Sequence, residues 1–398
     1  MTVPRGCREL NRRDVIRTAA LAALGVTASA IPGWSLPTSW FQAGEEIVPF
    51  TDVPEEFSTK SGTGPEIYPG EHTFRMDLRE LKSWTTPTLE FFAVSHYGIP
   101  KVDPASWQLS ATGLVSKPIA LKLEDIRKRP RVERTLTFEC SGNQAGIIHG
   151  MVGNATWAGT SLRMLLQELG PAASAKEVIF WAADSGEETI RNNKYTQNFA
   201  RSLSLDDAMR ADAILAYEMN GRPLPVAHGA PLRLVFPGYY GICNVKWLTG
   251  IEFSESRLMN RFMGRDYVTI KGRQVGDRVE WVETSVTKMH VKSVVARVTR
   301  TTGSDAFKVF GIAWSDGSPL KSVEVQIDDG AWQAARLETQ SNPYAWTFWT
   351  LETTGITPGD HTVTSRATDS SGRMQPASLE LKKTYWEDNA QFKRKIKI

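Results

Sequence analysis

The chain has 398 residues, of which 41% are hydrophobic and 23% charged, with a formal net charge of +3. This composition is typical of a globular protein that is long enough for two or three domains. The first 30 residues hold five arginines, one glutamate and one aspartate, so the rest of the chain balances 42 basic against 42 acidic residues. A neutral remainder gives no electrostatic argument for nucleic-acid binding.

Residues 1–30 are typical of a cleavable export signal. Arg12 and Arg13 precede a short apolar run, and small residues end the segment at 28–30. The arginine pair is the twin-arginine pattern, and the apolar run is too short to span a bilayer. We therefore expect export to the periplasm without a membrane anchor. Because this route carries folded proteins, often around a cofactor, the signal is a first indication of a bound group.

The next part of the chain predicts an irregular arm and then a mixed α+β domain. Residues 31–84 are rich in Pro, Gly, Ser and Thr, which favours an arm on the surface. Residues 85–284 mix strands and helices without regular βαβ alternation. The clearest elements are strands at 132–138 and 177–182 and a helix at 162–169, which Gly170-Pro171 ends.

Residues 285–390 predict an immunoglobulin-like β-sandwich. Apolar and polar residues alternate in several short runs, and turn signals rich in Asp, Gly and Ser separate them. The expected strands lie at 291–298, 307–314, 322–327 and 361–367. The aromatic run at 344–349 favours the core of the sandwich, although such clusters also serve interfaces.

Cys140 lies in the most informative segment, Thr137 to Asn143. It follows a β-rich run and precedes a glycine turn, which presents its sulfur at the end of a sheet. There a thiolate can act as a nucleophile or a metal ligand, although a small buried hydrophobe is the commoner fate of a free cysteine. After the export signal Cys243 is the other remaining cysteine, and the sequence leaves a disulfide between the two open. A Cys-x-x-Cys-His motif is absent from the sequence, which argues against a covalently attached haem.

A second informative stretch runs from Asn220 to Leu248. It places His228, Arg233 and Lys246 among glycines and prolines. Cationic donors on rigid turns suit a phosphate-bearing ligand, whereas the alternative is a surface loop with scattered charges.

Together these segments resemble the sulfite oxidase family of molybdenum enzymes over nearly the whole chain beyond the signal. Each motif alone is weak, but their order and spacing are specific. The motifs are Phe91-Phe92, His96 with Pro100, Glu139-Cys140-Ser-Gly-Asn143, the runs 157–162, 215–221 and 228–233, Val245-Lys-Trp-Leu248, and Arg265-Asp-Tyr267.

The resemblance implies a molybdopterin-binding domain at 85–284 and a dimerisation domain at 285–390. It implies that Cys140 ligates molybdenum and that Tyr267 lies near the oxo face of the metal. A soft thiolate suits a metal held by sulfur, and cations neutralise the phosphate of the cofactor. The residues implied to bind the molybdenum-pyranopterin cofactor are His96, Cys140, His228, Arg233, Val245 and Lys246.

The sequence departs from the family at the substrate side. Animal members have an arginine and an asparagine where this chain has Val94 and Ser95. Another arginine is then expected to bind an anionic substrate, and Arg201 and Arg265 are the candidates. Arg265 and Tyr267 share a face if that stretch is extended. The alternative is that each is a solvated surface arginine.

The resemblance implies a periplasmic sulfite dehydrogenase that passes electrons to a separate c-type cytochrome and forms a homodimer. One alternative keeps the cofactor and acts on sulfane sulfur or sulfoxides. The others are a hydrolase that uses Cys140 with His149 or His228, and a non-catalytic β-sandwich adhesion protein.

Overall fold

A computed structural model describes residues 44–53, 75–339, 342–379 and 386–398. The export signal expected at 1–30 and much of the expected arm at 31–84 lie outside the described residues. Those that are described all fall within one unit, Gly44–Ile398. Within it, no helix of the described ranges is long and apolar enough to cross a membrane.

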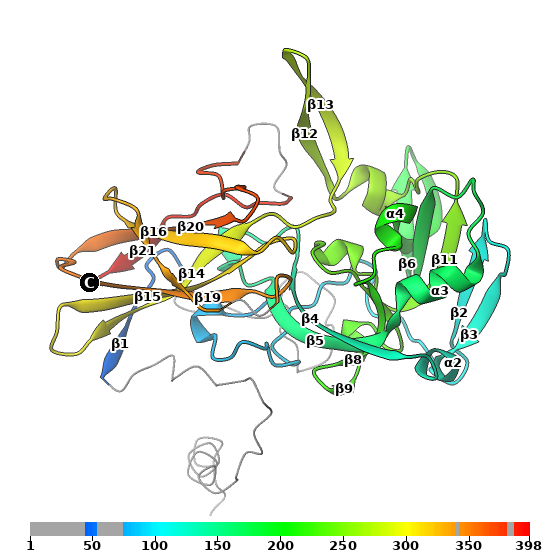
Figure 1. The fold of residues 1–398 in the computed structure, drawn as a ribbon, viewed down its shortest axis with the longest axis horizontal. Helices are drawn as coiled ribbons and strands as arrows, with labels where there is room; N and C mark the ends of the chain where they lie inside the picture. Colours follow the sequence, from blue (N-terminus) through cyan, green and yellow to red (C-terminus); the bar gives the residue numbers. More distant parts are fainter. Residues whose placement is uncertain (1–43, 54–74, 340–341, 380–385) are drawn as a thin grey trace, which may run out of the picture. The chain divides into compact units, whose positions relative to one another are not determined.

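Two five-stranded sheets form the first part of this unit (Figure 1). One has the order β10-β8-β5-β4, with β9 against β8, and is antiparallel; the other has the order β3-β2-β11-β6-β7, in which β2 and β11 run parallel. The first sheet consists of β4 (Arg131–Glu139), β5 (Val152–Ser161), β8 (Ile214–Met219), β9 (Arg222–Pro223) and β10 (Arg233–Val235). The second consists of β2 (Gln108–Gly113), β3 (Ile119–Lys122), β6 (Glu177–Ile190), β7 (Asn193–Ser204) and β11 (Leu248–Ser254).

Helices are short in the described ranges, so the α+β prediction is confirmed with strands dominant. The predicted helix is α3 (Leu162–Leu169): the Ser161 hydroxyl caps its first turn, and Gly170 ends it at φ 63°. The others are α2 (Leu123–Arg127) and α4 (Leu205–Ala208). Single turns are η1 (Leu78–Glu80), η2 (Ala145–Ile147), η3 (Val226–His228), η4 (Gly241–Cys243) and the π-helix η5 (Arg261–Arg265).

The predicted β-sandwich is present as two sheets with the orders β1-β14-β15-β19-β18 and β17-β16-β20-β21. The first sheet contains β1 (Glu45–Val48), β14 (Lys292–Thr301), β15 (Ala306–Trp314), β18 (Arg336–Leu337) and β19 (Thr347–Thr354). The second contains β16 (Leu320–Ile327), β17 (Gln333–Ala334), β20 (Asp360–Asp369) and β21 (Arg394–Lys397).

The sandwich extends further along the chain than the sequence indicates. Strand β1 comes from the expected irregular arm and pairs with β14, while β21 lies beyond residue 390 and pairs with β20. Within the aromatic run at 344–349, Trp346, Phe348 and Trp349 are buried, as the core interpretation expects.

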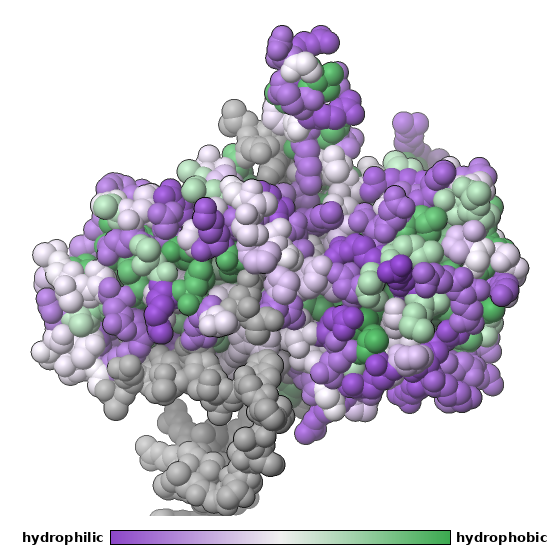
Figure 2. Space-filling view, in the orientation of Figure 1, coloured by the Kyte–Doolittle hydropathy of each residue, from purple (hydrophilic) through white to green (hydrophobic). Residues whose placement is uncertain are grey.

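Strands β12 (Val268–Val275) and β13 (Arg278–Ser285) form a separate antiparallel hairpin. It begins directly after Tyr267 and projects from the sheets (Figure 1). In the space-filling view most of its visible surface is hydrophilic, which agrees with side chains that face solvent on both sides (Figure 2).

The end of β4 is anchored in two ways, and both matter for the residue that follows it. Phe138 stacks on Trp157 of β5 with ring centroids 5.0 Å apart. Glu139 is buried and pairs with Lys292 of β14 at 2.8 Å. Cys140 therefore follows a strand end that both the first sheet and the sandwich hold in place.

Candidate active site

Cys140 begins the tight turn after β4. Its N–H donates to the Met151 carbonyl, and its own carbonyl accepts from the N–H of Asn143, both at 2.9 Å. The side chain is half-buried and lines a pocket. Burial raises the pKa of the thiol to about 11, so a nearby cation is needed to make it a thiolate at neutral pH. Cys140 and Cys243 are both free, so the disulfide left open by the sequence does not form.

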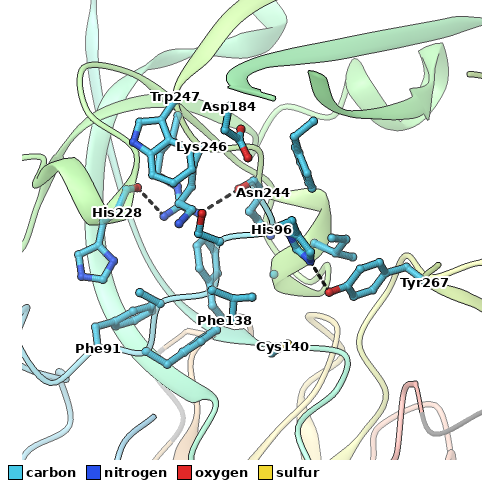
Figure 3. A pocket seen from close by; sticks show the side chains of 18 residues that line it. Phe91, His96, Phe138, Cys140, Asp184, His228, Asn244, Lys246, Trp247 and Tyr267 are labelled. Carbon is cyan, nitrogen blue, oxygen red and sulfur yellow. Dashed lines mark hydrogen bonds between the residues drawn. The ribbon is translucent and has the colours of Figure 1, made fainter. Parts of the chain in front are cut away.

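The pocket combines an apolar wall with a few convergent polar groups, as small-molecule and cofactor sites do. Figure 3 shows Lys246, Trp247 and Asp184 at one end of this view, with Cys140 at the other. The polar lining residues are Ser95, His96, Cys140, Asp184, His228, Arg233, Asn244, Lys246 and Tyr267; the aromatic wall includes Phe91, Phe92, Phe138 and Phe199.

Arg233, which is buried, and Lys246, which is half-buried, bring two positive charges to this pocket. Arg233 donates to the carbonyls of His228 at 2.8 Å and Asn244 at 3.0 Å, and its guanidinium lies 4.6 Å from the centre of the Trp157 ring. Lys246 Nζ donates to the Ala227 carbonyl at 3.0 Å. These acceptors are all neutral, and among the acidic side chains Asp184 stabilises the charge of Lys246. An anion bound in the pocket would stabilise both positive charges further.

The pKa values of both cations reflect their burial. Burial lowers the pKa of Arg233 to about 9. Burial, and then the positive charge of Arg233, lowers the pKa of Lys246 to about 7. A dianionic phosphate bound here would raise the pKa values of both side chains. By linkage, the phosphate would bind more tightly when both side chains are protonated.

Gly229 allows the turn that brings these two cations together. Its φ is 111°, and a Cβ there would lie 3.0 Å from Lys246 Cα and 3.1 Å from Arg233 Cβ. Only glycine adopts this conformation and leaves this space at low cost. The glycine- and proline-rich stretch singled out in the sequence is therefore a wall of the pocket and not a surface loop.

Asp184 is a site residue that the sequence interpretation missed. It lies in β6 where the pairing with β7 shifts register, and only 4% of it is exposed. Its Oδ1 has no hydrogen-bond partner among the described residues. Burial raises the pKa of Asp184 to about 6, against the opposing effect of Lys246. The signal was a carboxylate inside an apolar strand, which becomes meaningful only once the strand is seen to border a pocket.

His96 and Tyr267 form a hydrogen-bonded pair of polar side chains in the lining of the same pocket. His96 Nε2 lies 2.5 Å from the Tyr267 hydroxyl (Figure 3). Burial, and then the charge of Lys246, lowers the pKa of His96 to about 4, so the ring is neutral at physiological pH. The sequence assigned His96 to the cofactor, and the structure places it within reach of both the cofactor pocket and the tyrosine.

Arg201 and Arg265 do not line the pocket. Arg201 is fully buried and donates to the carbonyls of Phe262 and Val286 and to Cys243 Sγ. Arg265 pairs with Glu188 at 3.1 Å. The expectation that Arg265 and Tyr267 share a face is wrong because η5 ends at Arg265 and Tyr267 has a φ of 57°, so the stretch is not extended.

Val245 and His228 were also expected to bind the cofactor, and the structure places only His228 in the lining of the pocket. Val245 is buried and uses its carbonyl to accept from Leu234 N–H at 2.8 Å, while its neighbours Asn244 and Lys246 reach the pocket. His228 lines the pocket and points Nε2 at the Thr88 carbonyl, 3.1 Å away.

The residues present fit a molybdenum-pterin group. The two cations can bind its phosphate, the unpaired Asp184 oxygen can accept from a ring N–H, and one thiol lies at the other end. Among the described residues, no three His, Cys, Asp or Glu side chains gather as a metal site. The fold and the site thus define a molybdopterin-binding oxidoreductase.

Comparisons with known proteins extend this conclusion. Residues 96–262 match the model of the oxidoreductase molybdopterin binding domain, and residues 282–398 match the Mo-co oxidoreductase dimerisation domain. Sulfite oxidase of Gallus gallus is 30% identical over 319 residues, covering 74% of this chain and 68% of that protein. Mitochondrial sulfite oxidase of Drosophila melanogaster is 30% identical over 348 residues, covering 79% of this chain.

The chain spans 58% of the length of the mitochondrial enzyme of Rattus norvegicus and 59% of the fruit-fly enzyme. Among solved structures, the sulfane dehydrogenase SoxCD from Paracoccus pantotrophus matches with a TM-score of 0.69 and 25% identity, covering 81% of this chain and 84% of that one. The chain belongs to the sulfite oxidase family of molybdenum-pterin enzymes, and its cofactor is molybdenum-molybdopterin. The cysteine hydrolase and adhesion alternatives are therefore wrong.

Proposed function

We propose that the protein is a periplasmic sulfite dehydrogenase that passes electrons to a separate c-type cytochrome and works as a homodimer. The observation that carries this proposal is the arrangement of one pocket: Cys140 at one end, two cations at the other, and a hydrogen-bonded His96–Tyr267 pair in the same lining. The reaction adds one oxygen from water to sulfite and releases sulfate, two protons and two electrons.

Each side chain has a defined task in this reaction. When bound, the cofactor supplies oxygen-atom transfer and accepts the two electrons. Cys140 would hold the metal as a thiolate, with its proton released to solvent. Arg233 and Lys246 would bind the phosphate, and Asp184 could accept a hydrogen bond from the ring system of the cofactor. The neutral imidazole of His96 orients the Tyr267 hydroxyl, which can donate to an oxyanion without adding negative charge.

The test is a metal analysis combined with an activity assay. We expect about one molybdenum per chain and sulfite-dependent reduction of cytochrome c. Cys140→Ser removes the soft donor and should abolish both the metal-thiolate absorption band and turnover. Cys243→Ser is the matched control, because Cys243 is buried outside the pocket lining. Full activity in Cys140→Ser would refute the assignment.

A second candidate substrate is sulfane sulfur or a sulfoxide. It is favoured by the match to SoxCD and by Val94, which lines the pocket where animal family members have an arginine. Parallel assays with sulfite, a thiosulfonate and methionine sulfoxide separate these candidates. Turnover of a neutral sulfur compound with no response to sulfite would replace the first proposal with the second.

A further inference from the structure

Residues 386–389, here named the C-terminal clamp, contact the turn that Cys140 begins and the side chain of Tyr267. Trp386 stacks on Tyr267 with ring centroids 4.2 Å apart and an interplanar angle of 28°. The next residue, Glu387, donates its N–H to the Ser141 carbonyl at 2.7 Å, in the turn that Cys140 begins. A segment between strands β20 and β21 of the sandwich thus joins the cysteine turn to the tyrosine.

Gly142 makes room for the indole. A Cβ at this position would lie 3.0 Å from Cζ3 of Trp386 and 4.0 Å from Cys140 Sγ. Any larger residue at this position would contact the indole and lie close to the Cys140 sulfur. The Trp386 ring therefore packs directly against the turn of the metal ligand.

Buried polar contacts fix the clamp in place. Glu387 is fully buried, and its carboxylate lies 3.2 Å from both Lys271 Nζ and His290 Nε2. Lys271 is in β12, four residues after Tyr267. Lys292 Nζ also donates to the Asp388 carbonyl at 2.6 Å. The two residues that follow Trp386 are therefore fixed by buried polar contacts, which hold the backbone that carries the indole.

Tyr267 needs such support because of its own backbone. Its φ of 57° is a conformation that bulky residues rarely adopt, so the surrounding contacts must hold it. The hydroxyl bonds to His96 at one end of the side chain, and the face of the ring lies on Trp386. Without the Trp386 indole, one face of the Tyr267 ring loses the stacking contact that helps to fix its orientation.

We propose that Trp386 is a positioning residue, which holds the Tyr267 ring so that its hydroxyl stays on His96 inside the pocket. The kinetic part of this proposal rests on the proposed function, whereas its structural part does not. Trp386 acts through Tyr267, and Gly142 is the residue that lets it approach.

The test is a double-mutant cycle on the metal-loaded enzyme, with Trp386→Leu, Tyr267→Phe and the double variant. Trp386→Leu should keep its molybdenum and lower kcat by about tenfold to a hundredfold, as a small misplacement of an active-site group does. KM should change little. The double variant should be no slower than Tyr267→Phe alone, because the two changes remove the same interaction. Trp386→Phe, which keeps a ring to stack on, should restore most of the turnover.

Crystal structures of the same variants give a second readout that needs no substrate. In Trp386→Leu the Tyr267 hydroxyl should lie beyond hydrogen-bond distance from His96, and in Trp386→Phe it should remain in place. Gly142→Ala places a methyl group against the indole, so it should displace Trp386 and thereby move Tyr267 as well. An unmoved tyrosine, losses that multiply in the double variant, or loss of molybdenum in Trp386→Leu would each overturn the proposal. Absence of sulfite turnover in the wild type would instead refute only the proposed function.

Discussion

Replacing Lys292 by methionine tests how strongly the sandwich holds the end of strand β4, which precedes Cys140. Lys292 and Glu139 are 0% and 1% exposed, and their charged atoms lie 2.8 Å apart. Lys292 also donates to the carbonyls of Asn143 and Asp388. Without it, the partners that remain to the Glu139 carboxylate among the described residues are the neutral donors Asn143 and Trp314. Removing one partner of a buried pair costs about 3–5 kcal/mol, and we expect that loss in the free energy of unfolding.

The assay is chemical denaturation followed by tryptophan fluorescence and circular dichroism, with free energies taken where the two probes coincide. The double variant Lys292→Met/Glu139→Gln should recover part of the loss, because no charge is then left buried. Lys194→Met is the matched control: its pair with Glu187 has the same 2.8 Å distance but side chains that are 68% and 60% exposed, so we expect a loss of about 1 kcal/mol or less. A loss in Lys292→Met no larger than in this control would refute the reasoning.

Three further predictions concern charge, export and assembly. In the cofactor-free protein, binding of sulfate as a probe anion should weaken as the pH rises through about 7, where Lys246 loses its proton; Lys246→Arg should bind evenly across that range by calorimetry. Replacing Arg12 and Arg13 by lysines should leave the enzyme in the cytoplasm on cell fractionation, and normal export would contradict the twin-arginine assignment. Light scattering should give the mass of a dimer, and a monomer at all concentrations would show that the matched dimerisation domain does not pair two chains.

Local patterns in the sequence were sufficient to predict elements whose first and last residues are marked by capping or turn residues. Helix α3 has a capping serine before it and a glycine after it, so its predicted and observed limits agree. Strand β6 begins at the predicted residue but continues from Ala182 to Ile190, because β7 supplies a partner for its polar half. The four residues of β1 have no pattern of their own and become a strand only through β14.

The same distinction applies to the site. Cys140, His228, Arg233 and Lys246 were identified because each lies in a motif with local meaning, and all four line the pocket. Asp184 was missed because its role depends on a register shift and on a pocket formed by distant segments. For Arg265 the error was conformational, since the sequence does not reveal that a π-helix ends there.

The contacts between the Cys140 turn and the sandwich have a consequence for the site, although the residues that line the pocket all lie between Phe91 and Tyr267. The turn of Cys140 is bonded within its own domain through Met151, and to the segments of the second domain through Lys292 and Glu387. A change in the sandwich therefore reaches the Cys140 turn through one or two hydrogen bonds. The base of the β12–β13 hairpin has a similar route, because Lys271 pairs with Glu387, whose N–H donates to the Ser141 carbonyl. Because the side chains that line the pocket must hold their geometry for catalysis, the sandwich contributes to the site by holding the Cys140 turn in place.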